Sequence, residues 1–365
     1  MSIRRFLVDL SMLPRGTTGV GVYAIHMARH LERSFRCRVL APPYWCAQFN
    51  DPIECPPPLA WRNTLFGRDP SARFWRRELG LRSDDLLYAP HMRGHWGFDN
   101  QIVTIHDLIH HHYPTRNFVN NAYNRHVLPA VVRRARAVFT VSQTAKRELC
   151  DFYGLDPRRV DVVPNGIDLQ NWRPAPSAQP SRPPYLLTVS ANRPYKNTLE
   201  LLEQRSLWAD RYRLVIVSWR SRYGRALHRA VMNLGLQDRV DFLDGLPEHE
   251  LIALYRGCSA LVYPSLLEGF GRPPLEAMAV GRPVILSDIP VHRETFGEAG
   301  IFVTPGQPES WARAFAALDD PPRVADHIER GLRLAQRYSW QSCGQRLTDA
   351  LLQVEPALDA LRVGT

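Results

Sequence analysis

Two glutamates eight residues apart, Glu268 and Glu276, stand in a frame of glycines and prolines. Gly269 and Gly271 let the backbone come close to a ligand, and the prolines at 273–274 suit the first turn of a helix. Glu268 is therefore expected on a loop after a short buried strand, and Glu276 inside the helix that follows. Amides at a helix start favour an anion, and carboxylates accept hydrogen bonds from hydroxyls. This combination suits a phosphorylated sugar.

A pair of cations, Arg193 and Lys196, follows an expected strand at Tyr185–Ser190 and precedes a helical pattern. Two positive charges at such a strand end suit a diphosphate. The chain has only two lysines, Lys146 and Lys196, against 44 arginines. A lysine at this position indicates that the site needs the compact charge of an ammonium group and not the planar guanidinium of an arginine. The alternative is an ordinary surface loop.

The stretch 260–305, with its E-x7-E spacing, resembles the signature of the retaining, GT-B-fold glycosyltransferases of family 4. The segment 193–197, Arg-Pro-Tyr-Lys-Asn, is similar to that family's R-P-x-K-N motif. The resemblance implies that Arg193 and Lys196 neutralise the donor diphosphate and stabilise the departing nucleotide.

The same resemblance assigns the residues of the glutamate frame. It implies that Glu276 accepts hydrogen bonds from the ribose hydroxyls of the donor. Glu268, with the amides of Phe270 and Gly271, would hold the sugar, and Leu275 is placed among the donor-binding residues.

A histidine, His106, closes the expected strand Ile102–Asp107. The segment 106–108, His-Asp-Leu, resembles the family's H-D-L, in which the histidine reaches the donor sugar and stabilises the developing charge. Two alternatives stay open. His106 and His110 have the spacing of zinc ligands if the segment is helical, and a buried histidine can be purely structural.

A glycine-rich stretch that includes Gly19 and Gly21 follows the first strand. Together with Ala24, these glycines have the spacing of the G-x-G-x-x-G/A motif that binds dinucleotides. The acidic residue expected about 20 positions after that motif is missing. The prediction is a loop of free amides facing a cleft, like the family's amino-terminal glycine loop near the donor phosphate and the acceptor. The alternative is a helix start that binds nothing.

These residues require a scaffold of alternating strands and helices. The pattern predicts an α/β fold of two doubly wound Rossmann-like domains facing across a cleft. Strands are expected at Phe6–Asp9, Arg38–Ala41, Leu86–Pro90, Ile102–Asp107, Val138–Ser142, Val160–Pro164, Tyr185–Ser190, Arg213–Ser218, Val240–Leu243, Ala260–Pro264, Pro283–Ser287 and Ile301–Val303.

The expected domain boundaries follow from proline content. Residues 1–172 form the acceptor-side domain, and the proline-rich stretch 173–184 is the linker. Residues 185–336 form the nucleotide-sugar domain, and a helix within 337–365 returns to the first domain, as in the family. The segment 165–168, Asn-Gly-Ile-Asp, resembles the family's N-G-V-D at the exit of the first domain.

Composition narrows the class of protein. The chain has 365 residues, 45% of them hydrophobic and 22% charged, and no apolar run reaches the ~18 residues of a membrane span. Six scattered cysteines and the absence of a secretory pattern predict a reduced cytoplasmic protein.

The net charge of +10 is uneven, because residues 1–170 hold 23 Arg and Lys against 15 Asp and Glu. No nucleic-acid motif is present, so nucleic acid is not an expected partner. The run 72–82, with Phe74, Trp75, Arg76 and Arg77, is a candidate contact with an anionic membrane at the inner face of the plasma membrane. The alternative is an amphipathic helix on the core.

The expected function is therefore transfer of a hexose with retention of configuration, in surface polysaccharide biosynthesis. The segments 104–109 and 113–114 look most like bacterial mannosyltransferases, so GDP-mannose is the favoured donor and a UDP-sugar the other. The acceptor would be a glycan or a polyprenyl-diphosphate-linked sugar. No D-x-D occurs, so neither a metal nor another cofactor is expected. The alternatives are a GT-B nucleotide-sugar epimerase and an inactive sugar-nucleotide-binding module.

Overall fold

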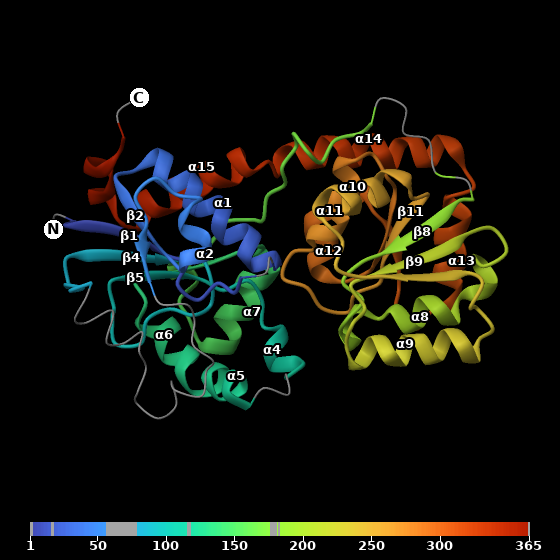
Figure 1. Cartoon of the computed structure of the whole chain (residues 1–365), viewed down its shortest axis with the longest axis horizontal. Helices are drawn as coiled ribbons and strands as arrows, with labels where there is room; N and C mark the ends of the chain where they lie inside the picture. Colours follow the sequence, from blue (N-terminus) through green and yellow to red (C-terminus); the bar gives the residue numbers. More distant parts are fainter. Residues whose placement is uncertain are drawn as a thin grey trace. The chain divides into compact units, whose positions relative to one another are not determined.

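The computed structural model describes residues 3–15, 18–55, 79–114, 118–175, 181 and 183–363. The chain divides into two compact units (Figure 1). The first unit combines residues 1–166 with 340–365, and the second holds residues 167–339. Each is an α/β unit around one parallel sheet, so the predicted pair of Rossmann-like domains is confirmed.

In the described part of the first unit, seven parallel strands lie in the order β3-β2-β1-β4-β5-β6-β7. Helices α1 and α15 lie on one face of this sheet, and α6 and α7 on the other (Figure 1). The strands are β1 (Arg5–Asp9), β2 (Cys37–Ala41), β3 (Ile53–Glu54), β4 (Asp85–Ala89), β5 (Gln101–Thr104), β6 (Ala137–Thr140) and β7 (Val160–Val162). The helices include α1 (Gly19–Ser34), α2 (Pro43–Cys46), α4 (Ile109–His112), α5 (Phe118–Ala122), α6 (Leu128–Arg134), α7 (Gln143–Tyr153) and α15 (Trp340–Val354).

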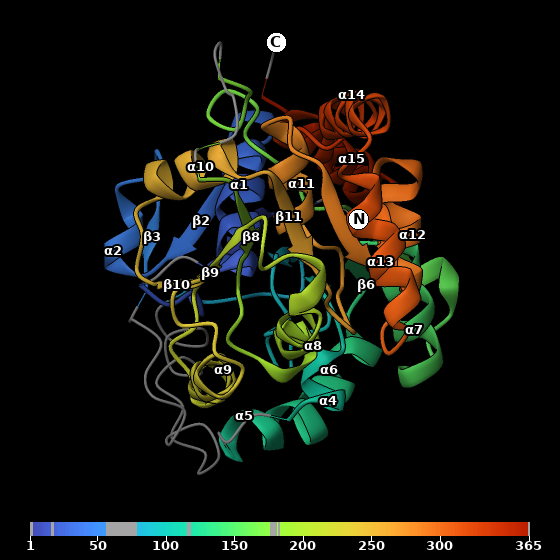
Figure 2. The same ribbon diagram turned by 90° about the vertical axis from the view of Figure 1, so that its right-hand side faces the viewer.

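In the described part of the second unit, six parallel strands lie in the order β10-β9-β8-β11-β12-β13. Helices α8 and α9 cover one face, and α10 and α11 the other (Figure 2). The strands are β8 (Tyr185–Thr188), β9 (Arg213–Val217), β10 (Val240–Leu243), β11 (Ala260–Tyr263), β12 (Val284–Ser287) and β13 (Ile301–Val303). The helices are α8 (Thr198–Glu203), α9 (Arg222–Asn233), α10 (Glu248–Gly257), α11 (Arg272–Ala279), α12 (Pro290–Phe296), α13 (Pro308–Ala317) and α14 (Pro321–Arg337).

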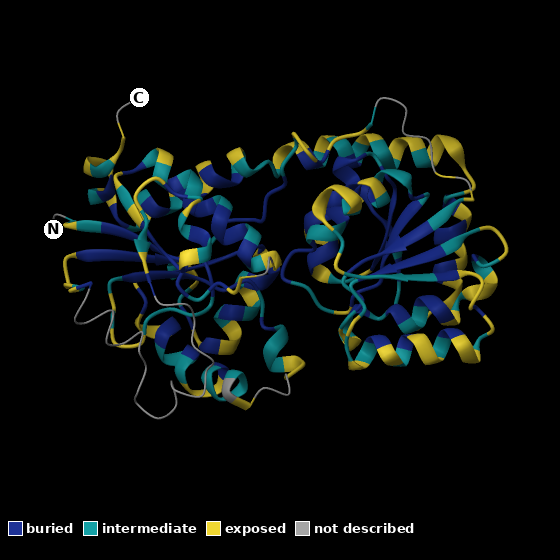
Figure 3. Ribbon diagram, viewed as in Figure 1, coloured by how far each residue is buried: buried dark blue, intermediate teal, exposed yellow. Residues whose placement is uncertain are grey.

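Both sheets are buried on two faces, which is why their strands are continuous apolar runs. Figure 3 shows the strands coloured as buried at the centre of each unit. In β4, for example, every residue is buried. All twelve strands predicted from sequence are present within a few residues of their expected ends.

The proline-rich stretch that follows β2 contains two short elements, α2 and β3. Pro43 occupies the first turn of α2, where its missing N–H costs nothing. The two-residue strand β3 is too short for a periodicity to reveal it.

The first boundary between the units falls after Gly166, earlier than the predicted linker at 173–184. The described part of that stretch belongs to the second unit, and hydrogen bonds attach the chain around its start to that unit. The guanidinium of Arg256 donates hydrogen bonds to the carbonyls of Asn171 and Arg173. The second boundary falls after Ser339, where 336 was expected.

The closing helix α15 packs against α1 within the first unit. The ring of His30 and the hydroxyl of Thr348 are 2.9 Å apart, and Arg136 pairs with Glu355 at 2.6 Å. Gly344 permits the close approach, because a Cβ there would lie 2.4 Å from His30 Nδ1.

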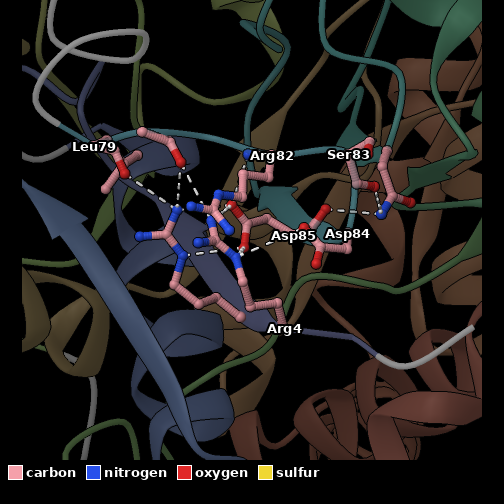
Figure 4. Close-up of polar contacts among 9 residues, drawn as sticks. Arg4, Leu79, Arg82, Ser83, Asp84 and Asp85 are labelled. Carbon is pink, nitrogen blue, oxygen red and sulfur yellow. Dashed lines mark hydrogen bonds and ion pairs between the residues drawn. The ribbon is translucent and has the colours of Figure 1, made fainter.

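The amino end of the first sheet is held by a carboxylate, Asp85 (Figure 4). Arg4 and Arg5 each donate two hydrogen bonds to it, at 2.5 to 3.0 Å, and the backbone N–H of Arg82 adds a third donor at 2.9 Å. Burial would raise the pKa of Asp85, but these donors and the charge of Arg5 outweigh it and lower the pKa to about 2.

We expect Asp85→Asn to lower the free energy of unfolding by about 2–3 kcal/mol, since it breaks a buried charge pair. The pKa of Asp85 is lower in the folded state than its ordinary value of about 3.9. The carboxylate therefore stabilises the fold above about pH 4, and this contribution fades as the pH falls towards about 2. Urea unfolding measures it. The exposed pair Arg134–Asp99 supplies the control: Asp99→Asn should change stability little, and equal effects would contradict the prediction.

Two further findings bear on membrane association. In the described part of the chain, no helix combines the length and the apolar character needed to cross a bilayer. The candidate membrane contact at residues 74–77 lies outside the described residues.

Candidate active site

The order of the second sheet places a topological switch point between β8 and β11. Chains leave these neighbouring strands towards opposite sides, and ligands of doubly wound sheets bind beyond the carboxyl ends at this point. Lys196 follows β8, and Glu268 follows β11. The fold therefore brings together two residues that lie far apart in the sequence.

Lys196, Glu268 and Tyr263 form one hydrogen-bonded cluster. Lys196 Nζ donates to the Tyr263 hydroxyl at 2.6 Å and to Glu268 Oε1 at 2.5 Å. The Tyr263 hydroxyl donates to the same carboxylate oxygen at 2.7 Å. The side chains of Lys196 and Glu268 are each 10% exposed. Lys196 and Glu268 therefore form a salt bridge that is almost excluded from solvent, and the Tyr263 hydroxyl bonds to both.

The cluster fixes the charge of Glu268. Burial alone would raise its pKa, but the charge of Lys196 and the hydrogen bonds from Lys196 and Tyr263 lower it. Burial and the neighbouring carboxylate raise the pKa of Tyr263 well above its ordinary value. Near neutral pH, the site thus contains a carboxylate and a neutral phenol.

Glu276 lies in α11, as predicted, and is buried. Its Oε2 accepts a hydrogen bond from the Tyr255 hydroxyl at 2.9 Å, and its Oε1 accepts one from Arg272 at 2.8 Å. Gly271 caps the helix with a φ of 99°, which an L-residue rarely adopts. Gly271 is therefore needed to turn the chain from the loop after Glu268 into the helix that carries Glu276.

The two predicted diphosphate cations differ in environment. Arg193 is exposed, and its side chain has no hydrogen-bond or ion-pair partner among the described residues, whereas Lys196 is buried. Asn197 follows with a φ of 55°. Two other non-glycine residues also have a positive φ: Ser190, after β8, at 59°, and Ser218, after β9, at 58°. Strained residues that gather at one sheet edge are typical of functional sites.

A residue that sequence reasoning missed is His292, in α12. It is fully buried, and its Nδ1 lies 3.0 Å from the Ser287 carbonyl. Its Nε2 has no hydrogen-bond partner in the described structure and would lie 3.5 Å from a Cβ placed on Gly271. Burial lowers its pKa to about 4, so it is neutral. A lone histidine in an amphipathic helix carries no signal of this placement.

His106 lies in the first unit, outside the strand that was expected to include it, Ile102–Asp107. Strand β5 ends at Thr104, so His106 stands in the following loop. The ring packs edge-on against Tyr23 at 4.7 Å between centroids, and Nε2 is 3.3 Å from the Pro90 carbonyl. Burial lowers the pKa of His106 to about 4.

The zinc alternative for His106 required helical spacing to His110. The helix α4 begins only at Ile109, so the two histidines do not share a helix. In the described ranges, no group of three or more His, Cys, Asp or Glu side chains is arranged to hold a metal ion.

The glycines Gly19 and Gly21 are not in a loop. They form the first turn of α1, and the Gly21 N–H donates to the Thr18 hydroxyl at 3.1 Å. The prediction of a free amide at Gly21 was therefore wrong, because Thr18 caps the helix. A Cβ at Gly19 would meet no atom within 4 Å.

Phe270 and Leu275, predicted to bind the donor, both contribute to packing. Leu275 is 1% exposed. The ring of Phe270 makes edge contacts with Tyr338 and Phe296, at 5.2 and 6.4 Å between centroids. Their side chains are part of the core, which leaves their backbone groups as the candidates for a ligand.

Comparison with known proteins gives consistent matches along most of the chain. Residues 17–171 match the family model described as Glycosyltransferase Family 4, and residues 172–333 match Glycosyl transferases group 1.

Two curated relatives illustrate the similarity. The chain is 35% identical over 254 residues to the O-antigen chain mannosyltransferase RfbU of Salmonella typhimurium, covering 70% of each protein. It is 33% identical over 240 residues to a D-inositol 3-phosphate glycosyltransferase of Kineococcus radiotolerans, covering 58% of this chain and 55% of that one.

A solved structure shows the same fold. Anabaena Alr3699/HepE, in complex with UDP and glucose, superposes with a TM-score of 0.76 at 19% identity, over 96% of this chain and 100% of that one. At this identity the likeness concerns the fold, which is of the GT-B type with two Rossmann-like domains.

Proposed function

This chain belongs to the family-4 glycosyltransferases, and on that premise we propose that it transfers mannose from GDP-mannose, with retention of configuration. The acceptor is a glycan or a polyprenyl-diphosphate-linked sugar of a surface polysaccharide. The observation that carries the proposal is the cluster of Lys196, Glu268 and Tyr263 at the switch point of the second sheet. The similarity to RfbU supports mannose as the sugar.

The donor binds to the second unit through its diphosphate. Lys196 Nζ has three N–H groups, of which two donate to Tyr263 and Glu268. The third is available for a phosphate oxygen of the donor. Arg193, exposed one helical turn earlier, adds a second cation. Both charges stabilise the negative charge that develops on the departing nucleotide.

The two glutamates hold different parts of the donor. Each oxygen of Glu276 accepts one internal hydrogen bond, and a carboxylate has about four acceptor sites, so ribose hydroxyls can add to it. Glu268 holds the sugar, with Phe270 and Gly271 presenting backbone amides. We assign no protein nucleophile. The acceptor attacks from the side of the leaving phosphate, which takes its proton.

We expect transfer to be unaffected by chelation. No D-x-D is present to hold a divalent ion on the diphosphate, and Arg193 and Lys196 supply the positive charge in its place. The measurement is the transfer rate with and without EDTA. Complete loss that Mg²⁺ or Mn²⁺ restores would contradict metal independence.

Incubation with a panel of nucleotide sugars, with and without lipid-linked acceptors, tests the function. Transfer of mannose from GDP-mannose supports the proposal. Interconversion of the nucleotide sugar would identify an epimerase, and binding without turnover would identify an inactive module.

We also propose peripheral association of the basic first unit with the anionic inner face of the plasma membrane.

A further inference from the structure

The first sheet has a switch point of its own, between β1 and β4. Asp9 is the last residue of β1, and His91 lies just beyond the end of β4. This is the position in the first unit that Lys196 and Glu268 occupy in the second. Asp9 is 2% exposed and His91 3% exposed. Two ionisable side chains are thus buried where a doubly wound sheet binds its ligand.

The hydrogen bonds of the pair fix its proton positions. Asp9 Oδ1 accepts from the backbone N–H of Ser11 at 2.8 Å. His91 Nδ1 accepts from the backbone N–H of Arg93 at 3.2 Å. A neutral His91 therefore carries its proton on Nε2. That atom has no hydrogen-bond partner among the described residues and lies 4.0 Å from Asp9 Oδ2.

One oxygen placed off the line that joins these two atoms can bond to both of them. A distance of 4.0 Å is too long for a hydrogen bond, but an oxygen about 2.8 Å from each atom would bond to both. Burial raises the pKa of Asp9 to about 6 and lowers that of His91 to about 3. Near neutral pH, the gap therefore lies between a carboxylate acceptor and an N–H donor.

A hydroxyl group fits this arrangement best. It donates to the Asp9 carboxylate and accepts from His91 Nε2–H. An anion would be repelled by Asp9, and a cation cannot accept from the histidine. The pair also lies beside His106, whose Nε2 faces the carbonyl of Pro90, the residue before His91.

We propose that Asp9 and His91 form a binding site for one hydroxyl of the sugar acceptor. The inference rests on the proposed function, because it takes the first unit as the acceptor side. It names residues that position the acceptor, with no proton transfer assigned to them.

The experiment uses the full chain and methyl glycosides of common hexoses as acceptor probes. The His91 ring is followed by NMR of protein labelled at histidine Cε1, with its signal assigned by its loss in His91→Gln. Glycoside affinities come from the titration. Binding of GDP and UDP is measured by calorimetry on the same samples, and inorganic phosphate is titrated separately.

We expect at least one glycoside to shift the His91 signal saturably. Asp9→Asn should weaken its binding about 10-fold or more, since it removes a charged hydrogen bond, and should leave nucleotide binding within about twofold. Asp161→Asn, in β7 of the same sheet, is the matched control and should keep glycoside affinity. By calorimetry, His91→Gln, which retains an N–H donor, should bind the glycoside better than His91→Phe.

Three results would overturn the inference. If nucleotides bind and no glycoside moves the His91 signal, the gap holds a buried structural water. If phosphate moves it and glycosides do not, the ligand is an anion. If Asp161→Asn weakens glycoside binding as much as Asp9→Asn, the effect is not specific to the pair. Failure of both GDP and UDP to bind the native protein would instead refute the proposed function.

Discussion

Replacing Lys196 by alanine should lower kcat/KM for the donor about 100-fold or more, because two effects add. The diphosphate loses a charged hydrogen bond. In addition, Glu268 stays buried without its cation, so burial should raise its pKa and favour the neutral acid. Transfer kinetics at saturating acceptor measure the loss. Lys196→Arg should recover only part of it, since a planar fork does not reproduce three donors around one nitrogen.

The chain provides a matched control for this variant. Lys146, the other lysine, is half-buried in α7 of the first unit, and Lys146→Ala should leave donor kinetics unchanged. Stability gives an independent test of the buried pair. The double variant Lys196→Ala with Glu268→Gln should unfold at a higher temperature than Lys196→Ala alone, because it removes the unpaired carboxylate. A folded Lys196→Ala variant with native kinetics would exclude the diphosphate role.

Glu276→Ala and Glu268→Ala should separate nucleotide binding from sugar transfer. Loss of Glu276 removes the acceptor for the ribose hydroxyls, so the Kd of GDP should rise about 10-fold or more. Loss of Glu268 releases Lys196 from its salt bridge. GDP should then bind as well as before or slightly more tightly, while kcat falls because the sugar is no longer held.

Calorimetric titration with GDP decides between these assignments. Tyr255→Phe is a useful companion, since it removes one donor to Glu276 and leaves its carboxylate in place. It should weaken GDP binding less than Glu276→Ala does. An equal rise in the GDP Kd for the Glu268 and Glu276 variants would show that the division between ribose and sugar is wrong.

The strands were predictable because a strand of a parallel sheet that is buried on both faces is a continuous run of apolar residues, as in Leu214–Val217 of β9. The ends of elements were not so clear. His106 was expected to close a strand and instead follows β5 in a loop, because apolar Ile105 extends the pattern past the last ladder pair at Thr104. Gly19 and Gly21 resembled a loop, although Thr18 marks a helix start.

The sequence identified the residue types of the candidate site better than their contacts. Lys196 and Glu268 were assigned separately to diphosphate and sugar, although their side chains bond directly. Tyr263 was predicted only as a member of the strand Ala260–Pro264, with no role in the site. The pair Asp9 and His91 went unnoticed, because its members are 82 positions apart in the sequence and meet only through the strand order. Contacts of this kind depend on topology, which a local pattern does not contain.

The division of the chain has a consequence for synthesis. The second unit is an insertion: it is complete at Ser339, whereas the first unit still needs residues 340–365. On the ribosome, domains usually fold in the order in which they emerge, the amino-terminal one first. Here the second unit is the first to be complete. The nascent first unit waits with α1 uncovered until α15 leaves the exit tunnel, while the second unit is already able to fold. The helix that packs against α1 is therefore translated after the whole second unit, and a chain released at Ser339 would hold a complete second unit and a first unit without α15.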